Sequence, residues 1–216
     1  MAIESVKHEF GLYSVRRSSR ARRSRLTITD DGATVVVLPL RAPDHEAADL
    51  VARHHSWIKR HQTRLTDQRI CLATRPSLAV GRAVTINGVT QVIRAGTAAQ
   101  RSALEDRLRR EARSVIGQRV AIRAPQLGVS VRRVTIRDQR TRWGSASRRG
   151  TLSFSWRLVM CPPEVLDYVV VHELAHLRVA GHSTEFWRLV DRHVIDSRAA
   201  RRWLREHHHE LRHALD

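Results

Sequence analysis

The sequence contains little cysteine, almost no lysine and no long apolar run. Only Cys71 and Cys161 occur in 216 residues, which excludes a disulfide framework and favours a reducing compartment such as the cytoplasm. No stretch reaches the roughly 18 consecutive apolar residues of a membrane-spanning helix. The N-terminal stretch MAIESVKHEF also lacks the apolar segment of a secretory signal. We therefore expect a cytoplasmic protein that does not span a membrane.

Arginine, and not lysine, carries nearly all of the positive charge of the sequence. Lys7 and Lys59 are the only lysines among 39 basic residues, and the net charge is +18. A positive field of this size attracts nucleic acid and other polyanions. A compositional bias toward arginine explains the same numbers, so nucleic acid is a possible partner that charge alone does not prove. The sequence does not indicate an oligomeric state.

The N-terminal part has the pattern of β-structure with one helix. Asp30-Asp31-Gly32 and Asn87-Gly88 each separate β-branched runs, which predicts two hairpins. Pro43-Asp44 favours the start of an amphipathic helix. A cluster of arginines precedes the first hairpin turn, and a solvated strand face is favoured there over a phosphate-binding patch. The cluster comprises Arg16, Arg17, Arg20, Arg22, Arg23 and Arg25.

The C-terminal part alternates helices and strands. The pattern predicts a helix from about Ala98 to Ile116 that ends near Gly117, then strands at about 131–137 and 151–156. The second strand, TLSFSW, either offers its edge to an extended peptide or lies inside the sheet. Three further helices are expected at about 163–179, 183–193 and 197–209. The whole predicts an α+β fold with a β-rich region at residues 1–95 and a second domain at residues 96–216.

The helix predicted to begin at Pro163 carries the pattern H-E-x-x-H. His172 and His176 are one turn apart, about 6 Å along the helix axis, so both imidazoles can reach one zinc ion. Glu173 lies beside that face, where it can take a proton from a zinc-bound water. The alternative is a core helix with incidental histidines, but each buried histidine would then need a partner. The pattern favours a metal site.

A catalytic zinc site needs a third protein ligand and one open position. His182 would lie about 9 Å beyond His176 on a continuous helix and could not share the metal. The helix must therefore break, and Gly181 allows this because glycine tolerates positive φ. Ser183 and Thr184 can start the next helix. Acidic alternatives for the third ligand are Glu185, Asp191, Asp196 and Glu206.

These residues resemble a known family. RWGSAS, LSFSWRLVMCPPEVLDYVVVHELAHL and GHSTEFW, in this order, are similar to the YgjP-like zinc metallopeptidases, which are in turn similar to the SprT-like and WLM zincins. The resemblance implies a zincin-like catalytic domain, with a sheet packed on the motif helix, preceded by a β-rich N-terminal domain. It also implies one zinc ion held by His172, His176 and His182, with Glu173 as the catalytic base.

The resemblance and the motif together predict a zinc-dependent metallopeptidase that acts on a protein or peptide. Besides the metal, an oxyanion stabiliser is needed, and Tyr168, Arg142 and His193 are candidates alongside structural roles for each. Trp143 is either a substrate platform or a plug at the end of the sheet. The competing hypothesis is a DNA- or RNA-associated zinc protein, possibly a protease acting on nucleic-acid-bound proteins. The presence of Glu173 favours the peptidase, because a structural zinc needs no base.

Overall fold

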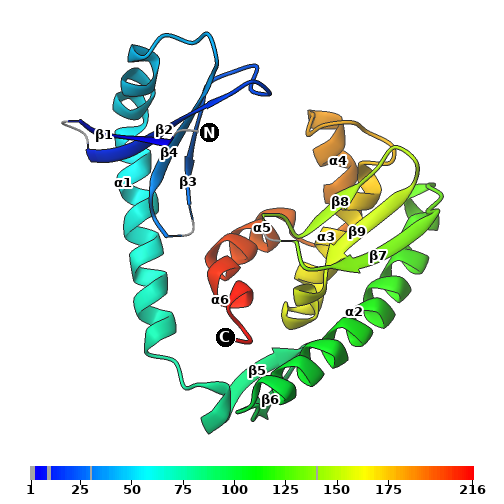
Figure 1. Cartoon of the computed structure of the whole chain (residues 1–216). Coiled ribbons are helices and arrows are strands. Elements are labelled where there is room, and N and C mark those ends of the chain that lie inside the picture. Colours follow the sequence, from blue (N-terminus) through cyan, green and yellow to red (C-terminus); the bar gives the residue numbers. More distant parts are fainter. Residues whose placement is uncertain (1–2, 9–10, 30, 140) are drawn as a thin grey trace. The chain divides into compact units, whose positions relative to one another are not determined.

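The computed structural model describes residues 3–8, 11–29, 31–139 and 141–216 (Figure 1). The chain divides into two compact units, Met1–Thr74 and Arg75–Asp216, here named unit 1 and unit 2. The predicted division lies later, between residues 95 and 96, because it places the second hairpin with the N-terminal region. Spatial contacts group that hairpin with the C-terminal residues, and the division into functional domains stays a prediction.

Unit 1 is a four-stranded sheet with one long helix. Its strands are β1 (Ile3–His8), β2 (Gly11–Ser18), β3 (Arg25–Ile28) and β4 (Thr34–Pro39), in the order β1-β2-β4-β3. β2 and β4 are parallel, and the other two pairs are antiparallel. Helix α1 (His45–Ala73) contacts β3 and β4. Val51 and Ile58, two turns apart on α1, are buried in the same small core as Val36 and Leu38 of β4.

Both predicted hairpins are present. Asp30 lies outside the described residues, but Gly32 has a φ of 85° and β3 and β4 pair on either side of it. Asn87 and Gly88 have φ values of 52° and 80°, as a type I′ turn requires, between β5 (Arg82–Ile86) and β6 (Val89–Ile93). A short 3₁₀ helix, η1 (Leu78–Val80), precedes this second hairpin.

Helix α2 (Ala98–Leu127) extends eleven residues beyond the predicted last residue, Ile116, and the expected end near Gly117 is wrong. Val120, Ala124 and Leu127 continue the buried stripe past the glycine, so packing outweighs the roughly 1 kcal/mol that a mid-helix glycine costs. The helix ends instead at Gly128, whose φ of 65° is the left-handed conformation that closes many helices.

A three-stranded sheet of order β7-β9-β8 lies at the centre of unit 2. β7 (Arg133–Arg137) runs parallel to β9 (Thr151–Ser155), and β8 (Gly144–Ala146) pairs with β9 in antiparallel fashion. β9 is therefore the internal strand, so of the two alternatives for TLSFSW the internal position is the one that the structure has. β8 is an outer strand of this sheet.

The remaining elements of unit 2 are helical: η2 (Trp156–Met160), α3 (Pro163–Ala175), α4 (Thr184–His193), α5 (Ser197–Glu206) and α6 (His208–Arg212). The main core of the unit collects residues from α2, β9, η2 and α3, and it extends to α4, α5 and α6. Among the helices that the structure describes, none combines the length and the apolar character needed to cross a membrane.

Candidate metal centre

Helix α3 holds the H-E-x-x-H motif inside the core of unit 2. Pro162 and Pro163 begin the helix, where a missing N–H has no cost. The helix ends at Ala175, four residues before the predicted end, and His176 is its C-terminal cap. The chain then continues in tight turns, in which the amides of Leu177 and Arg178 donate to carbonyls of the last helical turn. The second histidine of the motif therefore lies where the chain leaves the helix.

The reversal predicted at Gly181 is present. Gly181 has a φ of 75°, and nothing lies within 4 Å of the position that a Cβ would take, so the conformation alone explains the glycine. Ser183 then caps α4, because its Oγ accepts a hydrogen bond from the Phe186 amide at 3.3 Å. The turn brings His182 back beside α3.

The three histidines converge on one point. The Nε2 atoms of His176 and His182 each lie 3.2 Å from Nε2 of His172. Ligand nitrogens at about 2.0–2.1 Å from a tetrahedral zinc ion are separated by about 3.3 Å, so the donor set fits this metal. A neutral imidazole has one donor and one acceptor nitrogen, and three facing nitrogens cannot all satisfy one another. The triangle is the geometry of a cation site.

Within the described residues, these three histidines are the one group of His, Cys, Asp or Glu side chains close enough to hold a metal ion. The acidic alternatives for the third ligand are not part of that group. Asp191 accepts a hydrogen bond from Ser197, and Asp196 caps α5 by accepting from the amides of Arg198 and Ala199. These aspartates stabilise the α4–α5 connection instead.

Two aromatic rings of α4 pack against the histidine rings. Phe186 is fully buried and its ring centroid lies 4.4 Å from that of His176, in a stacked arrangement. The Trp187 ring stacks on His182, with 5.5 Å between the ring centroids. The Arg201 guanidinium lies over the Trp187 ring, 4.2 Å from its centroid. Sequence analysis did not identify Arg201, which comes from α5, because nothing in its local sequence connects it to the motif.

Burial keeps the first two histidines neutral. It lowers the pKa of His172 to about 3, with further lowering by His176, His182 and Arg201. Burial and His182 also lower the pKa of His176, against a backbone hydrogen bond with Val179 that raises it. Neutral imidazole is the form that binds metal. Val179 and, for His172, the Tyr168 hydroxyl at 3.3 Å from Nδ1 are the partners that orient the two rings.

Glu173 lies on the inner side of the site against strand β8. Its side chain is 5% exposed, and burial raises its pKa to about 7, although the positive charge of Arg142 lowers it. A Cβ at Gly144 would lie only 2.6 Å from Cγ and 2.7 Å from Oε1 of Glu173. Glycine is therefore required at this position, and the packing of β8 on α3 restricts the carboxylate of Glu173, which follows His172 in the helix.

The other candidate residues are placed in different ways. Tyr168 contacts His172, and burial raises the pKa of its hydroxyl to about 12, so the group stays protonated. The ring nitrogens of His193 face two backbone carbonyls, those of Leu189 and Gln126. Trp143 packs edge-on against His208 and lies under the Arg212 guanidinium, 4.9 Å from its ring centroid. This packing favours the plug over the substrate platform.

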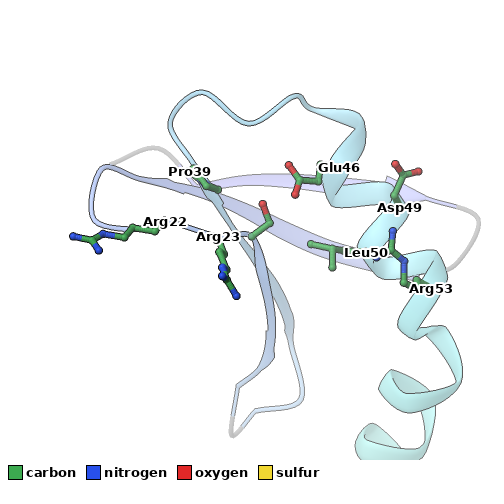
Figure 2. Close-up of a pocket in the computed structure, with 8 residues that line it drawn as sticks. Arg22, Arg23, Pro39, Glu46, Asp49, Leu50 and Arg53 are labelled. Atoms are coloured by element: carbon green, nitrogen blue, oxygen red, sulfur yellow. The ribbon is translucent and has the colours of Figure 1, made fainter.

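A separate surface pocket of about 490 Å³ lies in unit 1, between α1 and the segment before β3 (Figure 2). Its lining mixes three arginines with two carboxylates, so most of the charge is compensated and the pocket selects no ligand class. The lining residues are Arg22, Arg23, Ser24, Pro39, Glu46, Asp49, Leu50 and Arg53. Of the N-terminal arginine cluster, Arg17 is structural, since it donates to the carbonyls of Leu40 and Ala42.

Comparisons with known proteins identify the family of the chain. The family model of the YgjP-like metallopeptidase domain matches residues 22–96 and 89–207. No curated protein matches the chain. One solved structure, the crystal structure of the metallopeptidase zymogen of Pyrococcus abyssi abylysin, is 25% identical over 47% of this chain and 92% of that chain. Its TM-score of 0.33 is too low for an argument from fold. Because the family model spans most of the sequence, the chain belongs to the YgjP-like metallopeptidase family.

Proposed function

We propose that this protein is a zinc-dependent metallopeptidase in which His172, His176 and His182 hold one zinc ion and Glu173 is the catalytic base. The observation that carries the proposal is the convergence of three Nε2 atoms, two of them 3.2 Å from the third, beside a buried carboxylate. Family membership supports a metallopeptidase in general. A zincin-like catalytic domain, with a sheet against the motif helix, is the arrangement that we propose for this site, and the contact of β8 with α3 supports it.

When bound, zinc would lower the pKa of a water molecule and polarise the scissile carbonyl. Glu173 accepts the proton of the attacking water and later delivers a proton to the leaving amine. A base with a pKa of about 7 suits both steps, because it gains and loses a proton readily near neutral pH. Arg142 keeps enough positive charge nearby to hold part of the population ionised.

Two groups of this chain can assist the substrate. The protonated Tyr168 hydroxyl is the better oxyanion donor, since the rings of His193 already face carbonyl groups. Strand β8 has one neighbour in its sheet, β9, so its other side can pair with an extended peptide by β-addition. Gly144 at the start of β8 lies against Glu173, which supports a peptide site at this strand.

The test is metal content and peptidase activity measured on the same preparations. Wild type should contain about one zinc per chain by elemental analysis and cleave an unfolded protein such as denatured casein. His176→Ala should lose both zinc and activity. Glu173→Gln should keep zinc and lose activity by about three orders of magnitude, as expected when a general base is removed. Equal zinc in wild type and His176→Ala would mean that the site is misplaced.

A further inference from the structure

The sheet of unit 2 has a polar face that the peptidase site does not use. Leu152 and Phe154 of β9 are fully buried, so one face of the sheet is turned to the core. Because side chains alternate along a strand, Thr151 and Ser153 of β9 lie on the opposite face. The register places Arg133 and Thr135 beside them, and Ser145 of β8 on the other side. We name this the outer face.

Five exposed arginines lie on and around the outer face. Arg132 and Arg133 each donate their backbone amide to Gly150, which brings them next to the turn that carries Arg148 and Arg149. Arg137 follows at the far end of β7. Among the described residues, none of these five guanidinium groups forms an ion pair or a side-chain hydrogen bond. These five guanidinium groups are therefore exposed and carry unpaired charge within the described part of the chain.

The segment that carries these arginines contains little acidic charge. Asp138 is the only Asp or Glu between residues 129 and 155. It is engaged elsewhere, because it accepts a hydrogen bond from Arg157 at 3.1 Å and lies 3.9 Å from Arg212. An array of unpaired positive charges on one sheet face repels itself, so its free energy falls when an anionic partner binds.

The middle of the outer face offers hydroxyl and amide groups. Thr135 and Ser153 hydroxyls are 2.7 Å apart across β7 and β9, and the Gln139 amide donates to the Ser145 hydroxyl at 3.3 Å. Arginine together with Ser, Thr and Gln is the set of side chains that contacts phosphate and sugar in nucleic-acid complexes. The side chains that the sheet places on this face include no aromatic ring, so base stacking is not expected.

We propose that the outer face binds the phosphate backbone of double-stranded nucleic acid, without reading its sequence. From Arg133 to Arg137 the strand rises about 13 Å, which corresponds to about four nucleotides along one strand of a duplex. An acidic protein would also be attracted, but closely spaced unpaired guanidinium groups flanked by hydroxyls match phosphate oxygens better than scattered carboxylates. The surface is separate from the histidine triad and the proposal does not rest on the peptidase chemistry.

The experiment measures binding of the full chain to a fluorescein-labelled 20-base-pair DNA duplex by anisotropy, over a range of salt concentrations. The test variant combines Arg133→Gln, Arg137→Gln and Arg148→Gln. Its matched control combines Arg107→Gln, Arg110→Gln and Arg113→Gln, three exposed arginines of α2 that remove the same charge. The test variant should lose at least about tenfold in affinity, and the slope of log K against log salt should fall by about 2 to 3. The control should lose less than about threefold.

Three results would overturn the proposal. Equal losses in both triple variants would mean that binding follows net charge and not the outer face. Absence of duplex binding by the wild type at about 50 mM salt would exclude the outer face as a nucleic-acid site. Displacement of the duplex by polyglutamate at matched charge would assign the face to an acidic protein. Repeating the titration on zinc-free protein separates this result from the peptidase proposal, because duplex binding should be unchanged even if no zinc site exists.

Discussion

The two units differ in how much core they build and in what that core supports. In the described part of unit 1, the core cluster consists of six buried residues from the sheet and α1. In unit 2, a much larger buried cluster includes nearly every apolar residue of α3 and the Phe186 ring beneath the histidines. The histidine triad thus sits on the unit with the most extensive packing. Precise placement of metal ligands requires neighbours that cannot move, and only unit 2 supplies them.

The polar contacts of the two units differ in the same direction. Arg17 of unit 1 pairs with Asp44, whose side chain is 95% exposed. In unit 2, Arg123 pairs with the largely buried Asp167 of α3, and Arg157 joins Asp138 to the carbonyl of Leu211. Polar groups tie elements of unit 2 together from within, whereas the Arg17–Asp44 pair of unit 1 is exposed to water. The following predictions test how far this contrast holds.

The largest effect is expected at Gly144. Gly144→Ala places a methyl group 2.6 Å from Glu173, so β8 or the carboxylate must move, and we expect at least about a hundredfold loss of peptidase activity. Gly32→Ala in unit 1 meets no neighbouring atom and should lose only about 1 kcal/mol of stability through its positive φ. Activity and zinc content are measured for both. Full activity in Gly144→Ala would show that Glu173 is not held by β8.

The next largest effect is expected when a buried side chain is removed from the core of each unit. Phe186→Ala should lower the free energy of unfolding by about 3–5 kcal/mol. It should also weaken zinc binding, because the ring that packs against the histidines is lost. Ile58→Ala in the core of unit 1 should lower stability by about 2–5 kcal/mol while zinc content stays at the wild-type level. Urea denaturation and elemental analysis check the pair. Loss of zinc in Ile58→Ala would mean that the two cores are not independent.

Glu173 should make the metal-free protein less stable as the pH rises. Its pKa is raised from 4.5 to about 7 in the folded state, so its stabilising contribution is present below pH 4.5 and is lost between pH 4.5 and 7. The loss amounts to about 3 kcal/mol. Glu173→Gln lacks this titration. Denaturation of the zinc-free forms should therefore show the variant gaining on the wild type across that range, and a constant difference would contradict the burial of a charged carboxylate.

The smallest contrast concerns the two ion pairs. Asp167→Asn should reduce the free energy of unfolding by about 2 kcal/mol, because the partly buried Arg123 loses its partner. Asp44→Asn should cost less than about 1 kcal/mol, as is usual for an exposed pair. Urea denaturation in low and high salt measures both. Similar losses would show that burial of the pairs does not distinguish the units.

The sequence predicted the parts of the site that depend on spacing and turn chemistry. The distance between His172 and His176, the reversal at Gly181 and the cap at Ser183 follow from local rules, and the structure has all three. Predictions from the sequence were wrong, or left open, where tertiary packing determines the length or position of an element. The length of α2 depends on a buried stripe that continues beyond Gly117, and the internal position of β9 depends on strand pairing.

Long-range contacts also determine the surroundings of the site. The close approach of Gly144 to Glu173 joins residues 29 positions apart, and Arg201 reaches Trp187 from another helix. No periodicity or local motif encodes such contacts. The chemistry of the ligands could therefore be predicted from the sequence, while the side chains that orient and cover them could not.

The burial of Cys161 gives unit 2 an internal reporter. The thiol is 1% exposed between η2 and α3, and burial raises its pKa, so a reagent in solution cannot modify it while the unit is closed. In a Cys71→Ser background, the rate at which a chromogenic disulfide labels Cys161 then reports how often this unit opens. If zinc binds the closed form, zinc should slow the labelling. The labelling rate of Cys161 therefore measures how often unit 2 opens.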